Sequence, residues 1–142
     1  MGKPLFDLPI LVVDDDAMVR GVVVEYLKDL GFSNILEAKN SQHGLKLIQN
    51  SKFPLGLVLS DWEMPGVSGL VLLKALRKNP GRKGTRFIMI TSQRSMERFK
   101  ITQAAQWAVN AYIIKPFTCD VLKDKIWQVM GWDEGGGTQA TG

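Results

Sequence analysis

Short apolar runs alternate with longer segments of helical periodicity along the 142-residue chain. The third run is apolar without alternation, as expected for a strand that is covered on both faces. This order of elements is typical of an α/β domain with a parallel sheet. The apolar runs predict five strands, at residues 10–13, 34–38, 55–60, 86–91 and 111–114.

Helical periodicity follows each predicted strand. The first predicted helix ends at Gly31 and places its apolar residues on one side, namely Met18, Val22, Tyr26, Leu27 and Leu30. Further helices are predicted at residues 41–50, 68–79, 96–109 and 118–130. The last begins at the capping residue Thr118, and its predicted inner side comprises Leu122, Ile126, Val129 and Met130.

Length and composition indicate one folded domain. The chain is 45% hydrophobic and 23% charged, so it can bury a core without disulfides. We expect residues 1–132 to form this domain and the Gly-rich residues 133–142 to form a flexible tail or linker. Cys119 is the only cysteine, which excludes an internal disulfide, and no apolar run is long enough to span a membrane. We therefore expect a cytoplasmic protein that does not bind membranes.

Positive charge is concentrated in one part of the chain. From Lys74 to Lys100 there are nine basic residues and one acidic residue, a net +8, whereas the whole chain carries +4. This stretch could attract an acidic partner or nucleic acid, but a solvated face is the more ordinary interpretation. No aromatic residues alternate with these bases, and we expect no helix-turn-helix after Met130 unless the natural chain continues past Gly142 into an output domain. We therefore expect no specific nucleic-acid binding.

Polar residues follow four of the predicted strands. Because the carboxyl ends of parallel strands share one edge of a sheet, these residues should lie close together, where ligands of such sheets bind. They are Asp14, Asp15 and Asp16 after the first strand, Asp61 after the third, Thr91 after the fourth and Lys115 after the fifth.

Carboxylates that are brought together repel one another unless they hold a proton or a cation. Magnesium accepts one or two carboxylates and keeps positions open for phosphoryl oxygens. Lys115 would add positive charge and Thr91 a hydrogen-bond donor, so the set predicts a phosphoryl-binding site with Mg²⁺. Taken singly, the first aspartates could merely cap a helix and Asp61 could be a turn residue. Their conjunction favours the site.

The motifs as a set resemble the response-regulator receiver domain of two-component signalling, and most closely its chemotaxis CheY type. The resemblance covers about residues 8–131. It implies a flavodoxin-like, doubly wound (βα)5 fold with a five-stranded parallel sheet in the order 2-1-3-4-5. The matching residues are Val12-Val13-Asp14-Asp15, Ser60-Asp61-Trp62-Glu63-Met64-Pro65 with Gly69, Thr91-Ser92, and Tyr112-Ile113-Ile114-Lys115-Pro116-Phe117.

The resemblance also implies roles for individual residues. Asp61 would accept a phosphoryl group from a phosphohistidine on a histidine kinase or a histidine phosphotransfer protein. Asp15, Asp61 and the backbone carbonyl of Glu63 would bind Mg²⁺ directly, and Asp14 would bind it through water. Lys115 would contact the phosphoryl group, and the bond from Lys115 to Pro116 would be cis. The domain would thus catalyse its own phosphorylation and dephosphorylation.

The resemblance further implies a switch. Thr91 would move toward the new phosphoryl group and Tyr112 would turn inward. The surface formed by residues 96–109, 111–114 and 118–130 would then change its arrangement for a downstream effector, with flagellar-motor control as one possible output. We expect a monomer or a weak dimer.

Some residues depart from the chemotaxis pattern. Glu63 stands where that type has Asn and Gln93 where it has Glu, and both would flank the path of the hydrolytic water. We therefore expect Glu63 to change the lifetime of the phosphoaspartate. Trp107 and its neighbours replace a more usual Gly-containing run, so Trp107 is a candidate for an unusual output surface. The single histidine, His43, is expected at the surface, and Cys119 is expected to pack rather than react.

Other functions remain open at this stage. Asp14 to Asp16 also fit the D-x-D motif of haloacid-dehalogenase-type phosphatases, which would make Asp14 the nucleophile of a phosphohydrolase. That alternative leaves Asp61 and the loop after it unexplained, and Met18 stands where that motif has Thr or Val. A receiver could also act as an intermediate in a phosphorelay.

Overall fold

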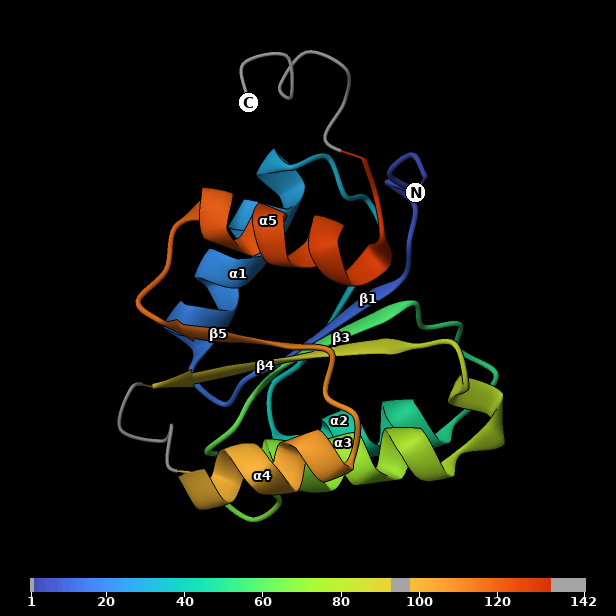
Figure 1. The fold of residues 1–142 in the computed structure, drawn as a ribbon, viewed down its shortest axis with the longest axis vertical. Coiled ribbons are helices and arrows are strands. Elements are labelled where there is room, and N and C mark those ends of the chain that lie inside the picture. Colours follow the sequence, from blue (N-terminus) through green and yellow to red (C-terminus); the bar gives the residue numbers. More distant parts are fainter. Residues whose placement is uncertain (1, 93–97, 134–142) are drawn as a thin grey trace.

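A five-stranded parallel sheet lies between two layers of helices in the computed structural model, which describes residues 2–92 and 98–133 (Figure 1). The strand order is β2-β1-β3-β4-β5, which confirms the predicted doubly wound fold. The strands begin and end within two residues of their predicted bounds. They are β1 Ile10–Val13, β2 Ile35–Ala38, β3 Leu57–Asp61, β4 Arg86–Ser92 and β5 Ala111–Lys115.

Two helices cover one face of the sheet and three cover the other (Figure 1). On the first face, Leu27 of α1 and Ile126 of α5 are fully buried against the sheet. On the second face, Ile48 of α2, Leu72 of α3 and Ala104 of α4 are fully buried. The helices are α1 Ala17–Asp29, α2 Ser41–Gln49, α3 Gly69–Lys78, α4 Arg98–Gln106 and α5 Cys119–Met130, with a short 3-10 helix η1 Pro80–Arg82.

The predicted inner side of α1 was partly wrong. Met18 is 83% exposed and Val22 is 45% exposed, whereas Val23, Val24 and Leu27 are buried. Three consecutive valines occupy positions 22–24, so the apolar pattern does not decide which of them face the sheet. The prediction for α5 was better, because Leu122 and Ile126 are buried; Val129 and Met130 pack at the edge of the core, and Trp127 is an additional buried residue.

Two predicted segments extend beyond the described residues. The helix expected at 96–109 is described as α4 over Arg98–Gln106, and residues 93–97, which include Gln93 and Met96, lie outside the described part of the chain. A turn follows α4, with Ala108 at φ +56°. Of the predicted tail, only Asp133 is described, and its backbone N–H donates to the Gly2 carbonyl at 2.7 Å.

Four aromatic rings meet near the amino ends of the strands. The Phe32 ring lies 5.5 Å from that of Phe6, 6.0 Å from that of Trp127 and 6.0 Å from that of Trp132. Gly131 ends α5 in the left-handed region at φ +72° and turns Trp132 back, so that its N–H donates to the Trp127 carbonyl at 2.9 Å. This cluster joins the residues before β1 to the segment after α5.

Candidate functional site

The register of the sheet brings the first and third strands' acids together. β1 and β3 are paired with Val13 opposite Ser60, so the next residues, Asp14 and Asp61, are neighbours at the carboxyl edge. One oxygen of each of Asp14, Asp15 and Asp61 lies within 4.8 Å of the others. The predicted acidic group is therefore a spatial cluster, and its oxygen ligands fit a hard divalent ion such as Mg²⁺.

Lys115 reaches this cluster from the end of β5. Its Nζ lies 3.0 Å from Asp61 Oδ1 and 3.7 Å from Asp14 Oδ2. The peptide bond from Lys115 to Pro116 is cis, as the resemblance implied. One ammonium thus faces three carboxylates, which leaves the cluster with a net negative charge.

Burial changes the protonation of two of these acids. Asp14 is 3% exposed and Asp61 is 8% exposed, whereas Asp15 is open to solvent. Burial raises the pKa of Asp14 to about 6; the charge of Asp61 adds to this rise, and the hydrogen bond from the Asp16 N–H and the charge of Lys115 oppose it. Burial likewise raises the pKa of Asp61, while the hydrogen bond and charge of Lys115 lower it. A bound cation would favour the ionised form of both.

The three consecutive aspartates have different structural positions. Asp16 caps α1, because its side chain accepts hydrogen bonds from the N–H groups of Met18 at 2.9 Å and Val19 at 3.2 Å. Asp14 and Asp15 instead lie in the acidic cluster. The capping interpretation is therefore correct for Asp16 alone.

The loop after Asp61 turns tightly into α3. Gly66 has φ +84°, which favours glycine. At Gly69 an added Cβ would lie 2.4 Å from the Asp61 carbonyl oxygen and 2.8 Å from Met89 Sδ, so only glycine lets the start of α3 approach this closely. These two glycines keep the loop folded back beside the acid at the end of β3.

Thr91 and Tyr112 lie on the neighbouring strands. Thr91 is buried at the end of β4, where its hydroxyl donates to the Ser92 carbonyl at 3.3 Å. The Tyr112 hydroxyl donates to the Ile101 carbonyl of α4 at 3.2 Å. Its ring stacks on that of Trp62, with centroids 6.5 Å apart and planes 13° apart. Ring stacking therefore connects Trp62, the residue after Asp61, to β5, and the Tyr112 hydrogen bond connects β5 to α4.

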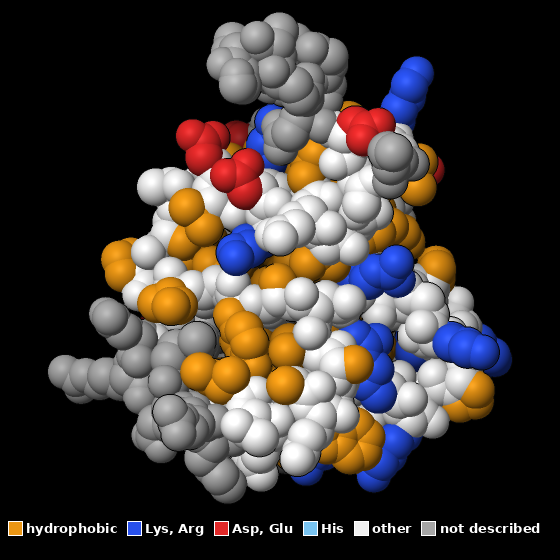
Figure 2. Space-filling model, in the orientation of Figure 1, with side chains coloured by type: hydrophobic (Ala, Val, Ile, Leu, Met, Phe, Trp, Pro, Cys, Tyr) orange, Lys and Arg blue, Asp and Glu red, His pale blue; other side chains and the backbone are white. Residues whose placement is uncertain are grey.

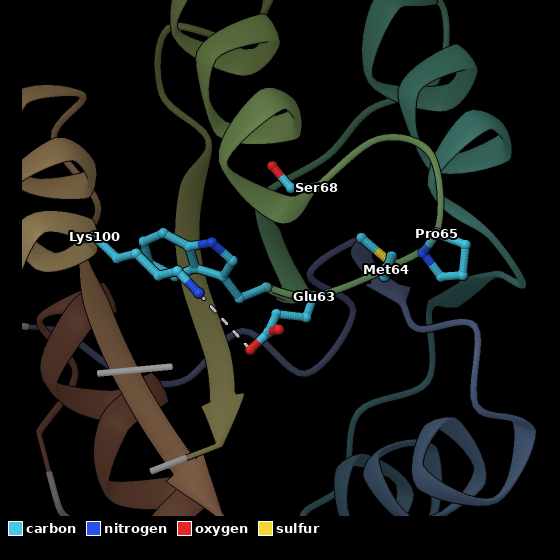
Figure 3. A pocket seen from close by; sticks show the side chains of 6 residues that line it. Glu63, Met64, Pro65, Ser68 and Lys100 are labelled. Carbon is cyan, nitrogen blue, oxygen red and sulfur yellow. Dashed lines mark ion pairs between the residues drawn. The ribbon is translucent and has the colours of Figure 1, made fainter. Parts of the chain in front are cut away.

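The loop that follows Asp61 lines a shallow pocket of about 510 Å³ (Figure 3). The Lys100 side chain reaches from α4 to Glu63, with Nζ 3.9 Å from Oε1 (Figure 3). Trp62 lines the same pocket, together with Met64, Pro65 and Ser68. The Glu63 side chain is thus held on the α4 side of the loop.

Two basic residues near the site were not predicted. Arg20 donates from Nη1 to the Asp14 carbonyl at 2.7 Å and from Nε to Glu37 at 3.1 Å. Lys100 was noted only as part of the basic stretch. No local pattern marks either residue, because each contact joins elements whose relative positions only the fold defines.

The predictions for His43 and Cys119 agree with the structure. His43 is exposed. Cys119 is partly buried, and burial, followed by the charges of Asp29 and Asp120, raises the pKa of its thiol. A raised pKa disfavours the thiolate, so these surroundings fit a packing role.

Comparison with known proteins decides the family. The family model for the response regulator receiver domain matches residues 10–127. The chain belongs to the response-regulator receiver family. The chemotaxis protein CheY of Pseudomonas aeruginosa is 39% identical over 119 residues, covering 84% of this chain and 93% of that protein. Chemotaxis protein CheY-3 of Vibrio cholerae is 40% identical over 120 residues, covering 84% and 89%.

Solved structures agree with this family. A CheY-like receiver domain protein of Methanospirillum hungatei has a TM-score of 0.76 at 28% identity, covering 87% of this chain and 94% of that one. CheY4 of Vibrio cholerae has a TM-score of 0.74 at 24% identity, covering 86% and 98%, which supports the fold. The protein is a CheY-type receiver domain of a two-component response regulator, not a haloacid-dehalogenase-type phosphatase. Receiver domains of this type act with kinases and effectors. Within the described residues, no helix is sufficiently long and apolar to span a bilayer.

Proposed function

We propose that Asp61 is the phosphoacceptor of this receiver domain. The observation that carries the proposal is the contact of its carboxylate with Lys115 at 3.0 Å, inside a cluster that also contains Asp14 and Asp15. Asp61 is the member of the cluster that contacts Lys115 most closely, and the residues that follow it line the shallow pocket. A phosphoryl group on this oxygen would meet both a lysine and a cation site.

In the proposed reaction, an Asp61 carboxylate oxygen attacks the phosphorus of a phosphohistidine on a histidine kinase or histidine phosphotransfer protein. The phosphorus–oxygen bond forms while the phosphorus–nitrogen bond breaks, and the partner's imidazole leaves. Asp14, Asp15, Asp61 and the Glu63 backbone carbonyl are the proposed residues for Mg²⁺, which supplies charge neutralisation of the phosphoryl oxygens. Lys115 orients Asp61 before transfer and contacts the phosphoryl group afterwards.

We further propose that the acidic edge transmits the signal through Thr91 and Tyr112. Thr91 hydrogen-bonds the new phosphoryl oxygens, and this movement clears space for the Tyr112 ring. Because Tyr112 bonds to Ile101 and stacks on Trp62, its movement also shifts α4. The proposed readout is the surface of α4, β5 and α5, which a downstream effector of a chemotaxis-like pathway recognises in one arrangement.

The test is phosphorylation with a small phosphodonor. The protein is incubated with acetyl phosphate and Mg²⁺, and the modified aspartate is located by mass spectrometry. We expect the label on Asp61, its loss in Asp61→Asn, and slower labelling in Asp14→Asn because a cation-site acid is removed. Asp16→Asn is the matched control, since Asn also caps a helix and should label normally. A label on Asp14, or labelling that persists in Asp61→Asn, would overturn the proposal.

A further inference from the structure

The two helix layers differ sharply in charge. Helices α1 and α5 contain four acidic and four basic residues. Helices α2, α3 and η1 contain five basic residues and no acidic one, and residues 39–60 and 64–92 include no Asp or Glu. On the face in Figure 2, the acidic side chains gather beside α5, while Lys and Arg lie along the lower right, where α3 runs. The second layer therefore presents an excess of positive charge.

Two arginines of this layer are held by neutral groups rather than by carboxylates. Arg77 donates to the carbonyls of Thr85 at 2.8 Å and Ala108 at 2.8 Å, and to the Asn110 side-chain oxygen at 2.7 Å. Arg82 is 2% exposed and donates to four backbone carbonyls, which belong to Leu47, Ile48, Asn50 and Phe53. These bonds fix the arginines in place but leave their positive charge uncompensated.

Lys74 and Lys78 occupy neighbouring positions on α3 and both contact Trp107. Their Nζ atoms lie 5.5 Å and 5.3 Å from the centre of the indole ring. Within residues 2–92 and 98–133, no carboxylate forms an ion pair with either lysine. Like charges four residues apart on a helix repel one another, so an anion between them would relieve the repulsion. Arg77 also donates to the Trp107 backbone carbonyl at 3.3 Å, which ties the main chain at Trp107 to α3.

A groove of about 610 Å³ runs beside these lysines, between α2 and α3. Its apolar lining includes Leu45, Val71 and Ala75, and Val71 is 42% exposed. Lys74 and Lys78 are its only charged lining residues. The groove thus combines an apolar surface with two positive charges that have no acidic partner in the described part of the chain.

We propose that this α2–α3 groove, with Lys74, Lys78 and Trp107 beside it, is a docking surface for an acidic segment of a partner protein that carries apolar side chains. Apolar side chains of the segment occupy the groove, and its carboxylates pair with the two lysines. A nucleic-acid strand fits less well, because both lysines already cover the Trp107 ring on which a base would stack. The groove lies between α2 and α3 rather than on the proposed α4–β5–α5 readout, and only Trp107, which follows α4, adjoins that readout.

The experiment uses the unphosphorylated chain and three synthetic peptides of equal length. One contains Glu with Leu and Phe, the second replaces each Glu by Gln, and the third replaces the apolar residues by Ser. Binding is followed by amide chemical shifts, and the same titration is repeated with a single-stranded oligonucleotide. We expect the first peptide to bind most tightly, with shifts in α2, α3 and Trp107, and with affinity that falls as salt is added.

Variants locate the contact. Lys74→Glu with Lys78→Glu should weaken binding of the first peptide by about tenfold or more, and the milder Lys74→Gln with Lys78→Gln by less. Val71→Ser should weaken binding of the first peptide but not binding of the Ser-containing peptide. Lys3→Glu with Lys28→Glu is the matched control, because it makes the same change of net charge at exposed lysines outside this surface. The proposal is overturned if the control weakens binding equally, if the shifts map to another surface, or if the oligonucleotide or the Ser-containing peptide binds as tightly.

Discussion

At the amino ends of the strands, the polar and apolar groups that are buried have partners. The rings of Phe6, Phe32, Trp127 and Trp132 pack together, and buried Arg82 donates to four carbonyls. At the carboxyl ends, three acids face one lysine, and burial raises the pKa of two of them. The amino end therefore satisfies its buried groups by packing and hydrogen bonds, whereas the carboxyl end keeps mutually repelling carboxylates that a bound cation would neutralise.

The largest effect on stability is expected when an aromatic ring is removed at the amino ends of the strands. Trp127→Ala should lower the free energy of unfolding by about 3–5 kcal/mol, because it leaves a cavity beside Phe32 and Trp132. Urea unfolding followed by circular dichroism measures the loss. Met18→Ala, at a side chain that is 83% exposed, is the control and should change stability by less than about 0.5 kcal/mol. Equal losses of unfolding free energy in both variants would show that the aromatic cluster stabilises the fold no more than an exposed side chain does.

The hydrogen bonds of buried Arg82 are the second feature at the amino ends of the strands whose contribution to stability can be measured. Arg82→Met should lower the free energy of unfolding by about 2–3 kcal/mol, because carbonyls at the end of α2 lose their donors in a buried place. Lys83→Met, at the exposed neighbouring residue, is the control. If both variants unfold at the same urea concentration as the parent, the guanidinium contributes nothing beyond packing. Phosphorylation of the folded variants should be unchanged, since neither residue contacts the acidic cluster.

The same contrast explains what the sequence could predict. The acidic cluster was predictable because strand order and register place residues after Val13 and Ser60 side by side. The contacts of Arg77, Arg82 and Lys100 were not, because each joins segments far apart in the chain and no periodic pattern marks them. The face of α1 was misjudged for a different reason, since its three consecutive valines fit more than one orientation.

At the carboxyl end, the expected effect of pH is smaller and has the opposite sign to the usual acid denaturation. The folded-state pKa of Asp14 is about 6, above its ordinary value of 3.8, so the folded state binds this proton more tightly than the unfolded chain. Without Mg²⁺, stability should therefore fall as pH rises through about 6, by on the order of 1 kcal/mol after screening by solvent. The raised pKa of Asp61 acts in the same direction.

Urea unfolding at pH 5 and pH 7 measures this dependence. The charges of Asp61, Lys115 and Asp15 also affect the pKa of Asp14. The measurement is therefore repeated with the Asp14→Asn variant and with Mg²⁺. Asp14→Asn should flatten the slope, and Mg²⁺ should stabilise the parent more at pH 7 than at pH 5 because it binds the ionised acids. Asp16→Asn should keep the parent slope. A slope that survives in Asp14→Asn would mean that other groups dominate the titration.

The smallest effect on stability is expected for the ion pair of Glu63 and Lys100, which lies at the carboxyl ends of the strands. The charges are 3.9 Å apart and the side chains are 61% and 25% exposed, so removing the pair should change the free energy of unfolding by less than about 0.5 kcal/mol. The lifetime of the phosphoaspartate should nevertheless change, because Glu63 lies two residues from Asp61 and Lys100 holds its carboxylate toward α4 (Figure 3).

Rates of dephosphorylation in Glu63→Asn, Lys100→Gln and the double variant measure that coupling. If Lys100 acts through Glu63, Lys100→Gln should alter the rate in the parent but not in Glu63→Asn. Lys78→Gln, which removes a lysine remote from Glu63, is the control. A rate in Glu63→Asn equal to that of the parent would remove Glu63 from the chemistry. An effect of Lys100→Gln that persists in the double variant would instead mean that Lys100 influences the dephosphorylation rate without Glu63.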